Sequence, residues 1–336
     1  MGKRRLALTA AAVATLVAAA LAGYWVWAAG QVRAAIDEWA EAQRAAGYDV
    51  AYAGPEVRGF PVRLAVSLDA PRIAAPAGWR WSGTAIAGDA AFWQPLLLRL
   101  ALPRTQEIEA DWRGYRRTLR LDAMSAGGVV RLNTRGRVTA ATLEMTDVTV
   151  REAAGGRLRA GRLYQRMTRL PEGEAGLQLH GEIGGLVLPE APPAPLPATI
   201  DRLVYSAEIV GAMAPGDPAA ALAAWRDAGG LLEVADLSLT WGPLEVRADG
   251  TAALDELLRP QGAFSARIAG LPEMLDALVA ENLMEPGAAA ALRLMVLTLA
   301  EGRDADGRPI VRLPVTLQDG RVFLGPAPLA RLAPVL

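Results

Sequence analysis

Alternation of apolar and polar residues is the feature that most constrains the fold of this chain. From residue 48 to about residue 188, apolar residues recur with period two, for example at Leu64, Val66, Leu68, Leu177, Leu179 and Ile183. This period places the apolar side chains on one face of a β-strand. Glycine pairs such as Gly127–Gly128 and Gly155–Gly156 predict turns between strands. We therefore expect consecutive antiparallel hairpins with one apolar face.

A change of parity predicts one irregularity in this sheet. The apolar residues Leu143 and Met145 are odd-numbered, whereas the next ones, Val148 and Val150, are even-numbered. A β-bulge or a turn between them restores a common face.

The second half of the chain combines strands with helices. Asp217–Pro218 predicts a helix start, because aspartate caps a helix and proline suits its first position, and Gly229–Gly230 predicts the end of that helix. Two more helices are expected, from Pro272 to about Ala280 and over Ala288–Ala300. Alternating apolar residues predict strands at 203–209, 237–241, 244–248, 264–268, 311–317 and 322–324, with a turn at Asp319–Gly320 between the last two.

A proline-rich segment at residues 189–198 predicts a linker, because proline has no N–H to donate to a sheet. The fold class we expect is mainly β (α+β): a transmembrane helix followed by a strongly curved antiparallel sheet, either in two similar halves or continuous. The predicted organisation is a basic tip at 1–5, an anchor at 6–29, a juxtamembrane helix at 30–47, and β-rich halves at 48–188 and 199–336, the second with helices.

The N-terminus predicts a membrane anchor. Residues 6–29 are nearly all apolar, and a helix of this length crosses the ~30 Å hydrocarbon core of a bilayer. The cationic residues 3–5 are expected in the cytoplasm, and the aromatic residues Tyr24, Trp25 and Trp27 at the opposite interface. The sequence thus predicts a single-pass protein of the cell inner membrane with its C-terminal domain in the periplasm.

Two alternatives stay open in this region. Ala20–Leu21–Ala22 matches the small-x-small pattern of a cleaved signal peptide, although the apolar run continues beyond it. Val32, Ile36 and Trp39 continue with helical spacing, and Gly47 is placed to end the helix. That helix is either a stalk above the membrane or the first helix packed on the domain.

Composition excludes several classes of protein. The formal net charge is −1, and −4 without residues 3–5, so the chain does not resemble a nucleic-acid-binding protein. With 52% apolar residues it has ample material for a core. The absence of cysteine excludes disulfides, thiolate metal sites, cysteine nucleophiles and a cysteine-linked lipid.

No catalytic, cofactor-binding or metal-binding residue emerges as a candidate. His180 is the only histidine and faces the polar side of its predicted strand, so we interpret it as a surface residue. Lys3 is the only lysine, which excludes a P-loop, and no Gly-x-Ser-x-Gly motif occurs. The neighbouring carboxylates Asp37–Glu38 and Asp255–Glu256 point apart on a helix or strand. We expect a protein that is not an enzyme and needs no cofactor.

Several motifs together resemble one family. Gly59–Phe60–Pro61 leads into an alternating strand soon after the N-terminal segment. Further matching positions are Trp225–Arg226, Gly229–Gly230, Trp241–Leu244, Gly250–Thr251, Leu254–Asp255, Pro260, Asp319–Gly320, Gly325–Pro326 and Leu329. The set resembles the family called domain of unknown function 2125, found in Gram-negative inner membranes, and covers almost all of the chain.

These motifs also have structural interpretations. Gly59 suits a positive φ, Phe60 a hydrophobic plug, and Pro61 the entry into an edge strand. Trp225 and Trp241 are expected to be core or groove-lining aromatic residues.

The family resembles, more distantly, the AsmA-type periplasmic proteins, which are associated with phospholipid movement to the outer membrane. The resemblance implies an apolar groove that binds or passes on acyl chains, in a protein held by the inner membrane through residues 6–29. The alternative is an envelope scaffold that docks partner proteins through sheet edges or apolar patches. The apolar helix Ala288–Ala300 either closes such a groove or plugs the sheet as a core helix.

Overall fold

The computed structural model describes the backbone of residues 2–76, 78–91, 93–112, 115–153, 155–171, 175–189, 192, 196–213, 218–281, 284–304, 306–325 and 327–335. Within these ranges, side chains are described from Thr15 onward, except those of Val17, residues 111–115, Pro218, Ala288 and residues 327–329. The expected helix start at Asp217 and most of the proline-rich segment lie outside the described residues.

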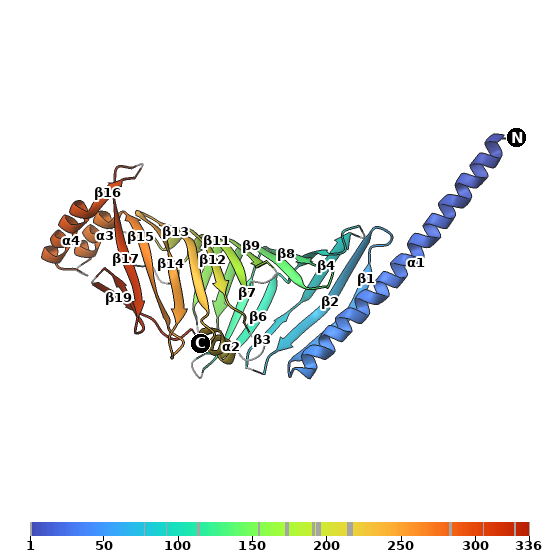
Figure 1. The fold of residues 1–336 in the computed structure, drawn as a ribbon, viewed down its shortest axis with the longest axis horizontal. Coiled ribbons are helices and arrows are strands. Elements are labelled where there is room, and N and C mark those ends of the chain that lie inside the picture. Colours follow the sequence, from blue (N-terminus) through green and yellow to red (C-terminus); the bar gives the residue numbers. More distant parts are fainter. Residues whose placement is uncertain are drawn as a thin grey trace.

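Helices lie at both ends of one long sheet (Figure 1). α1 (Gly2–Ala45) lies at the first end, α3 (Leu271–Ala280) and α4 (Pro286–Leu299) lie at the last end, and α2 (Pro218–Asp227) lies along one edge. The predicted helix ends are confirmed: Gly47 follows α1 with a φ of 90°, and Gly229 follows α2 with a φ of 78°.

The strands are β1 (Asp49–Arg58), β2 (Arg63–Ala74), β3 (Arg80–Gly83), β4 (Ala85–Ala91), β5 (Leu97–Ala101), β6 (Thr105–Trp112), β7 (Tyr115–Asp122), β8 (Ser125–Leu132), β9 (Val138–Glu152) and β10 (Arg157–Arg169). They continue with β11 (Gly176–Val187), β12 (Thr199–Val210), β13 (Leu231–Trp241), β14 (Leu244–Leu254), β15 (Pro260–Ala269), β16 (Ala300–Arg303), β17 (Pro309–Gln318), β18 (Arg321–Leu324) and β19 (Ala327–Arg331). All the pairings between them are antiparallel, which confirms the mainly β prediction.

The strands on the two sides of the proline-rich segment belong to one sheet. β11 and β12 pair from Gly176 opposite Val210 to Val187 opposite Thr199. The Leu188 N–H then donates to the Ala198 carbonyl over 2.8 Å. Residues on the two sides of 189–198 therefore belong to neighbouring strands of one sheet.

Between β2 and β9 the sheet divides into two rows of short strands that lie side by side. One row is β3, β6 and β7, and the other is β4, β5 and β8; both begin on β2 and end on β9. The rows are separated by a line of interrupted pairing, which continues into β12. Its positions are Ala70, Thr84, residues 102–104 and 123–124, Asp147, Gly161, Gly185 and Asp201. We call this feature the bulge line.

The bulge line bends the sheet into a trough. Ala70, Asp147 and Gly185 have φ values of 45°, 48° and 62°, so the backbone leaves the extended conformation there. Such irregularities bend strands and increase their twist. Figure 1 accordingly shows β4 and β8 along one edge, and β3, β6 and β7 along the other. The irregularity predicted between Met145 and Val148 is confirmed at Asp147.

One face of the trough is apolar over nearly its whole length, and we call it the inner face. Residues in register across the strands carry it from β2 to β17: Val66, Gly88, Leu100, Gly128, Leu143, Gln165, Gly181, Tyr205, Leu237, Ala248, Ala266 and Leu313. Near β9 this face is buried by the sheet itself and not by a helix. Met145 is 5% exposed and packs in one cluster with Ala123, Val148 and Ala160, which are all residues of the sheet or of its turns. The predicted face is confirmed.

The last end of the inner face is closed by α3 and α4. Leu271 of α3 and Val296 of α4 pack in one cluster with Ala266, Val311 and Leu313. The outer side of α4 remains uncovered, since Leu294 is 68% and Leu297 57% exposed. Of the two alternatives for the helix Ala288–Ala300, the core helix that plugs the sheet is therefore wrong, because α4 covers the end of the sheet with one side only.

Some local predictions were wrong. Gly127–Gly128 lies inside β8, where a Cβ on Gly128 would approach the Thr142 carbonyl oxygen to 2.0 Å, so glycine serves close packing there rather than a turn. Phe60 is 56% exposed and is no plug. Pro61 precedes β2, which is an interior strand because β1 covers its free edge.

Other interpretations are confirmed. Gly59 has a φ of 102°, and Gly155 forms part of the turn between β9 and β10 with a φ of 116°. Trp225 is 5% exposed, and its indole donates to the Val210 carbonyl. Trp241 packs against the cluster under α3 and α4.

In the part of the chain described with side chains, no helix meets the length and hydropathy required of a membrane span. The first part of the expected anchor, residues 6–14 with Val17, lies outside that part.

Replacement of Gly128 by alanine tests the close approach of β8 and β9. The added Cβ would overlap a backbone oxygen of a paired strand, so we expect a loss of roughly 1–3 kcal/mol in the free energy of unfolding. Gly287→Ala is the control, because a Cβ there meets nothing within 4 Å. Equal unfolding midpoints for the two variants in urea would contradict this packing.

Candidate functional site

An apolar cavity lies between α1 and the first strands of the inner face. Its volume is about 330 Å³, at the lower end of the ~300–1,000 Å³ found for small-molecule sites. The side chains and backbone that line it are Val32, Ile36, Leu64, Val66, Leu68, Ile86, Gly88, Asp89, Ala90, Pro95, Leu98 and Leu100. We call this cavity the groove.

The sequence builds the groove from two periodicities. Leu64, Val66 and Leu68 face the cavity because they alternate along β2. Val32 and Ile36 face it from α1 because residues four apart lie on one helix face. Trp39, expected on the same stripe, is 46% exposed instead. The helix is therefore the wall that turns an open sheet face into a cavity.

Polar contacts hold α1 in this position. The Arg44 guanidinium donates to the Val50 carbonyl from Nε over 3.0 Å and from Nη2 over 2.8 Å. The Tyr52 hydroxyl donates to Asp37 Oδ1 over 2.8 Å, and burial together with this carboxylate raises the pKa of Tyr52. α1 packs against β1 and β2, so it is the first helix of the domain and not a free stalk.

A third contact fixes α1 near the β1–β2 turn. The Trp25 indole donates to the Arg63 carbonyl over 2.8 Å. Its ring also meets that of Phe60 edge to face, with centroids 5.7 Å apart. Trp25, which makes both contacts, belongs to the aromatic end of the predicted anchor at residues 6–29.

Asp89 is the one carboxylate among the residues that line the groove. Its neighbour in register is Arg99, whose Nη1 lies 3.9 Å from Asp89 Oδ2. That oxygen is buried and accepts no hydrogen bond from the described residues. Asp89 and Arg99 also border a second pocket, together with charged residues such as Glu56 and Arg58. The carboxylate thus belongs to the polar side of the sheet.

A shallow pocket of about 500 Å³ surrounds His180 on the face opposite to the groove. His180 is exposed, as predicted, and its Nδ1 lies 2.9 Å from Ser206 Oγ. This pair does not complete a catalytic triad, because no described acid hydrogen-bonds the other ring nitrogen. Both residues sit in interior strands, where the backbone N–H groups of an oxyanion hole are already used in the ladders.

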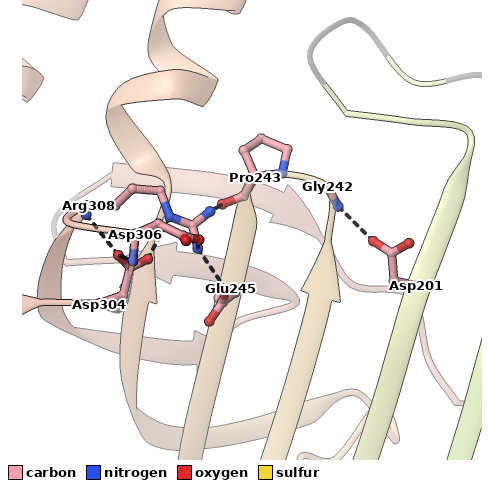
Figure 2. A network of polar contacts seen from close by, with 7 residues as sticks. All are labelled: Asp201, Gly242, Pro243, Glu245, Asp304, Asp306 and Arg308. Carbon is pink, nitrogen blue, oxygen red and sulfur yellow. Dashed lines mark hydrogen bonds and ion pairs between the residues drawn. The ribbon is translucent and has the colours of Figure 1, made fainter.

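Three carboxylates, Glu245, Asp304 and Asp306, meet at the last end of the sheet with oxygens within 4.8 Å of one another (Figure 2). Arg308 lies among them. Its Nε donates to Asp304 over 2.6 Å, and its Nη2 donates to Glu245 over 2.7 Å and lies 3.4 Å from Asp306. The guanidinium supplies the positive charge that a metal ion would otherwise bring, so we assign the cluster a structural role.

Arg308 also links its own turn to the β13–β14 turn and to the start of β14. Its Nη1 donates to the Pro243 carbonyl over 2.6 Å, and the neighbouring Gly242 N–H donates to Asp201 over 3.0 Å. Burial acts to raise the pKa of Asp304, but hydrogen bonds from the Arg308 backbone and side chain outweigh it and leave this pKa below its usual value.

The same turn geometry recurs at Asp255. Its Oδ1 accepts from the backbone N–H groups of Leu257 and Arg259, and its Oδ2 accepts from Arg259 Nε over 2.7 Å. Burial again opposes these hydrogen bonds, which lower the pKa of Asp255. From the sequence, Asp255 was treated only as one of two neighbouring carboxylates that point apart, and both turns were missed, although both share the Asp-x-x-x-Arg spacing.

Taken together, these features define a class: a trough-shaped β protein with an apolar inner face, closed by helices at one end and walled by α1 at the other. The chain belongs to the family described as "Uncharacterized protein conserved in bacteria (DUF2125)", whose model matches residues 25–333. No match was found among the curated proteins or among the solved structures.

The Asp-x-x-x-Arg turns predict a pH dependence of stability. The pKa values of Asp255 and Asp304 are lowered by folding, so their stabilisation is complete above the unfolded value of about 3.9 and is lost as the pH falls through the folded values. We expect the double variant Asp255→Asn, Asp304→Asn to melt below wild type at pH 7, with a difference that shrinks below about pH 4.

Asp306→Asn is the matched control within one of these turns, because its side chain is 75% exposed and lies at the longer distance from Arg308. We expect it to melt close to wild type. A double variant that melts like this control at pH 7 would contradict the role given to the two turns.

Proposed function

We propose that this protein is held in a bacterial inner membrane by residues 6–29 and binds or passes on acyl chains of phospholipids in the groove. The observation that carries the proposal is the groove itself, whose lining is apolar except for Asp89. Clefts lined predominantly by apolar side chains are typical binding sites for apolar ligands. A distant likeness to the AsmA-type proteins, stated above on sequence grounds, points the same way.

The surroundings of the groove support this proposal. The inner face continues beyond the groove with half-buried residues such as Leu143, Leu163 and Ile183, whereas its last end is buried under α3 and α4. An acyl chain that enters beside α1 would thus meet apolar surface along the trough. Gln165 and Tyr205 form the polar exception there, hydrogen-bonded to each other across Gly181.

The lipid content of the purified chain tests the proposal. We expect the full-length protein, extracted in mild detergent, to carry phospholipid or fatty acid detectable by native mass spectrometry. The variant Leu98→Gln, Leu100→Gln should lose most of it, because each amide facing an acyl chain without a partner costs about 1–3 kcal/mol.

Leu257→Gln is the control, since Leu257 is 62% exposed in a turn distant from the groove. Circular dichroism should confirm that both variants fold. Wild-type protein that is consistently free of lipid, or a groove variant that carries as much lipid as the control, would contradict the proposal.

The proposed location has its own test, which the absence of cysteine makes clean. We expect a single cysteine at Leu257 to react in whole cells with a maleimide that passes the outer membrane but not the inner one. Protection until the inner membrane is broken would contradict a periplasmic domain. N-terminal sequencing of the same sample separates a retained anchor from cleavage after Ala22.

A scaffold function is the second candidate, and the outer side of α4 favours it. Leu294, Leu297 and Leu299 are 68%, 57% and 46% exposed, which leaves an apolar strip at the last end of the sheet. A photocrosslinker at Leu297 that captures one envelope protein in cells, in a chain that carries no lipid, would favour this function over the first.

A further inference from the structure

Two neighbouring turns beside the groove expose apolar side chains. Phe60 and Val62, in the β1–β2 turn, are 56% and 48% exposed, and Trp93 and Leu96, in the β4–β5 turn, are 62% and 38% exposed. The turns lie side by side, because Arg63 at the start of β2 is paired with Ala91 at the end of β4. We call these four residues the apolar rim.

The apolar rim stands at the mouth of the groove. Pro95, in the same turn as Trp93 and Leu96, lines the groove, as does Leu98 directly after that turn. On the other side, Phe60 contacts Trp25 of α1. The exposed rim therefore adjoins the apolar cavity.

Arginines border the rim, and carboxylates are scarce there. The β8–β9 turn is joined to the rim by the Leu132 N–H, which donates to the Leu96 carbonyl. Arg135 and Arg137 in this turn are exposed, as is Arg131 near the end of β8. Arg63 follows the first rim turn and is exposed as well. The segments 59–62, 93–96 and 131–137 contain no aspartate or glutamate. This charge pattern complements an anionic surface.

The level of the rim along α1 adds an independent observation. Trp25 meets the rim, and the neighbouring Tyr24 and Trp27 are 47% and 60% exposed. Aromatic residues at the end of an apolar helical run mark the interface between hydrocarbon and headgroups. The rim thus lies at the depth at which the apolar run of residues 6–29 ends.

We propose that the apolar rim inserts into the headgroup region of an anionic lipid bilayer, with the bordering arginines on lipid phosphates, so that the groove opens against the leaflet. This inference rests on the proposed function for its membrane anchor. It concerns the contact of the apolar rim with the bilayer, which we call the seat of the domain, and not the ligand in the groove. Aromatic and aliphatic side chains held at an interface together with cations are the features that bind such surfaces.

Site-specific labels test the seat directly, because the native chain has no cysteine. Phe60→Cys and Trp93→Cys, each in the full chain, would carry an environment-sensitive fluorophore. After reconstitution in vesicles of phosphatidylcholine and phosphatidylglycerol, we expect a blue shift of emission and quenching by nitroxide lipids. Leu257→Cys, exposed in a turn far from the rim, should respond only to a quencher in the water.

The arginine border is tested in the same vesicles with Arg135→Glu, Arg137→Glu added to the Trp93→Cys chain. We expect less quenching by nitroxide lipids, and equal quenching would overturn the role of the arginines. Labels at 60 and 93 that behave like the label at 257 would overturn the seat. Labels shielded from the aqueous quencher yet insensitive to nitroxide lipids would overturn it too, in favour of a protein partner on the rim.

These outcomes are separate from those of the lipid analysis. Quenched labels on a chain that carries no lipid would contradict acyl-chain binding in the groove and would support insertion of the apolar rim into the bilayer. Unquenched labels on a lipid-loaded chain would contradict insertion of the apolar rim and would support acyl-chain binding in the groove.

Discussion

The bulge line is the constraint on which the rest of the structure depends. A flat antiparallel sheet would expose its whole apolar face, and a large exposed face of this kind is not stable in water. Interrupted pairing at positions such as Ala70, Asp147 and Gly185 lets the strands bend, so that the two rows face each other across the trough. Residues such as Met145 and Val148 become buried on both sides of one bend.

Burial along the trough is unequal, and this inequality produces the groove. At the last end, α3 and α4 supply Leu271 and Val296 to complete a core. At the first end, α1 meets the sheet only through a narrow face, with Val32 and Ile36 above Val66 and Leu98. The polar contacts of Arg44 and Trp25 hold the helix there while the space between remains open. The groove is therefore a consequence of how one helix is attached.

Strands could be predicted from the sequence, because apolar and polar residues alternate along a strand wherever a sheet has one apolar face. It also located the irregularity at Asp147, since a bulge inverts the parity of the residues that follow. It misread Gly128 as part of a turn, because glycine marks turns and close strand packing equally well. The Asp-x-x-x-Arg turns were missed although Asp304 and Arg308 are only four residues apart. The further contact of Arg308 with Glu245 could not be predicted, because it depends on which segments become neighbours, and that is not a local property.

The groove could be predicted only in part, because its walls follow from local sequence periodicity and its shape follows from tertiary contacts. The stripe of Val32 and Ile36 and the alternation of Leu64, Val66 and Leu68 were both readable, but their meeting across a cavity follows from tertiary contacts far apart in the sequence. The most direct measurement of the central claim is photocrosslinking with a diazirine-labelled phospholipid, followed by mapping of the modified peptides. The account predicts adducts concentrated on the peptides that contain Ile36, Val66 and Leu98. Adducts confined to the outer side of α4, or spread evenly over the chain, would contradict it.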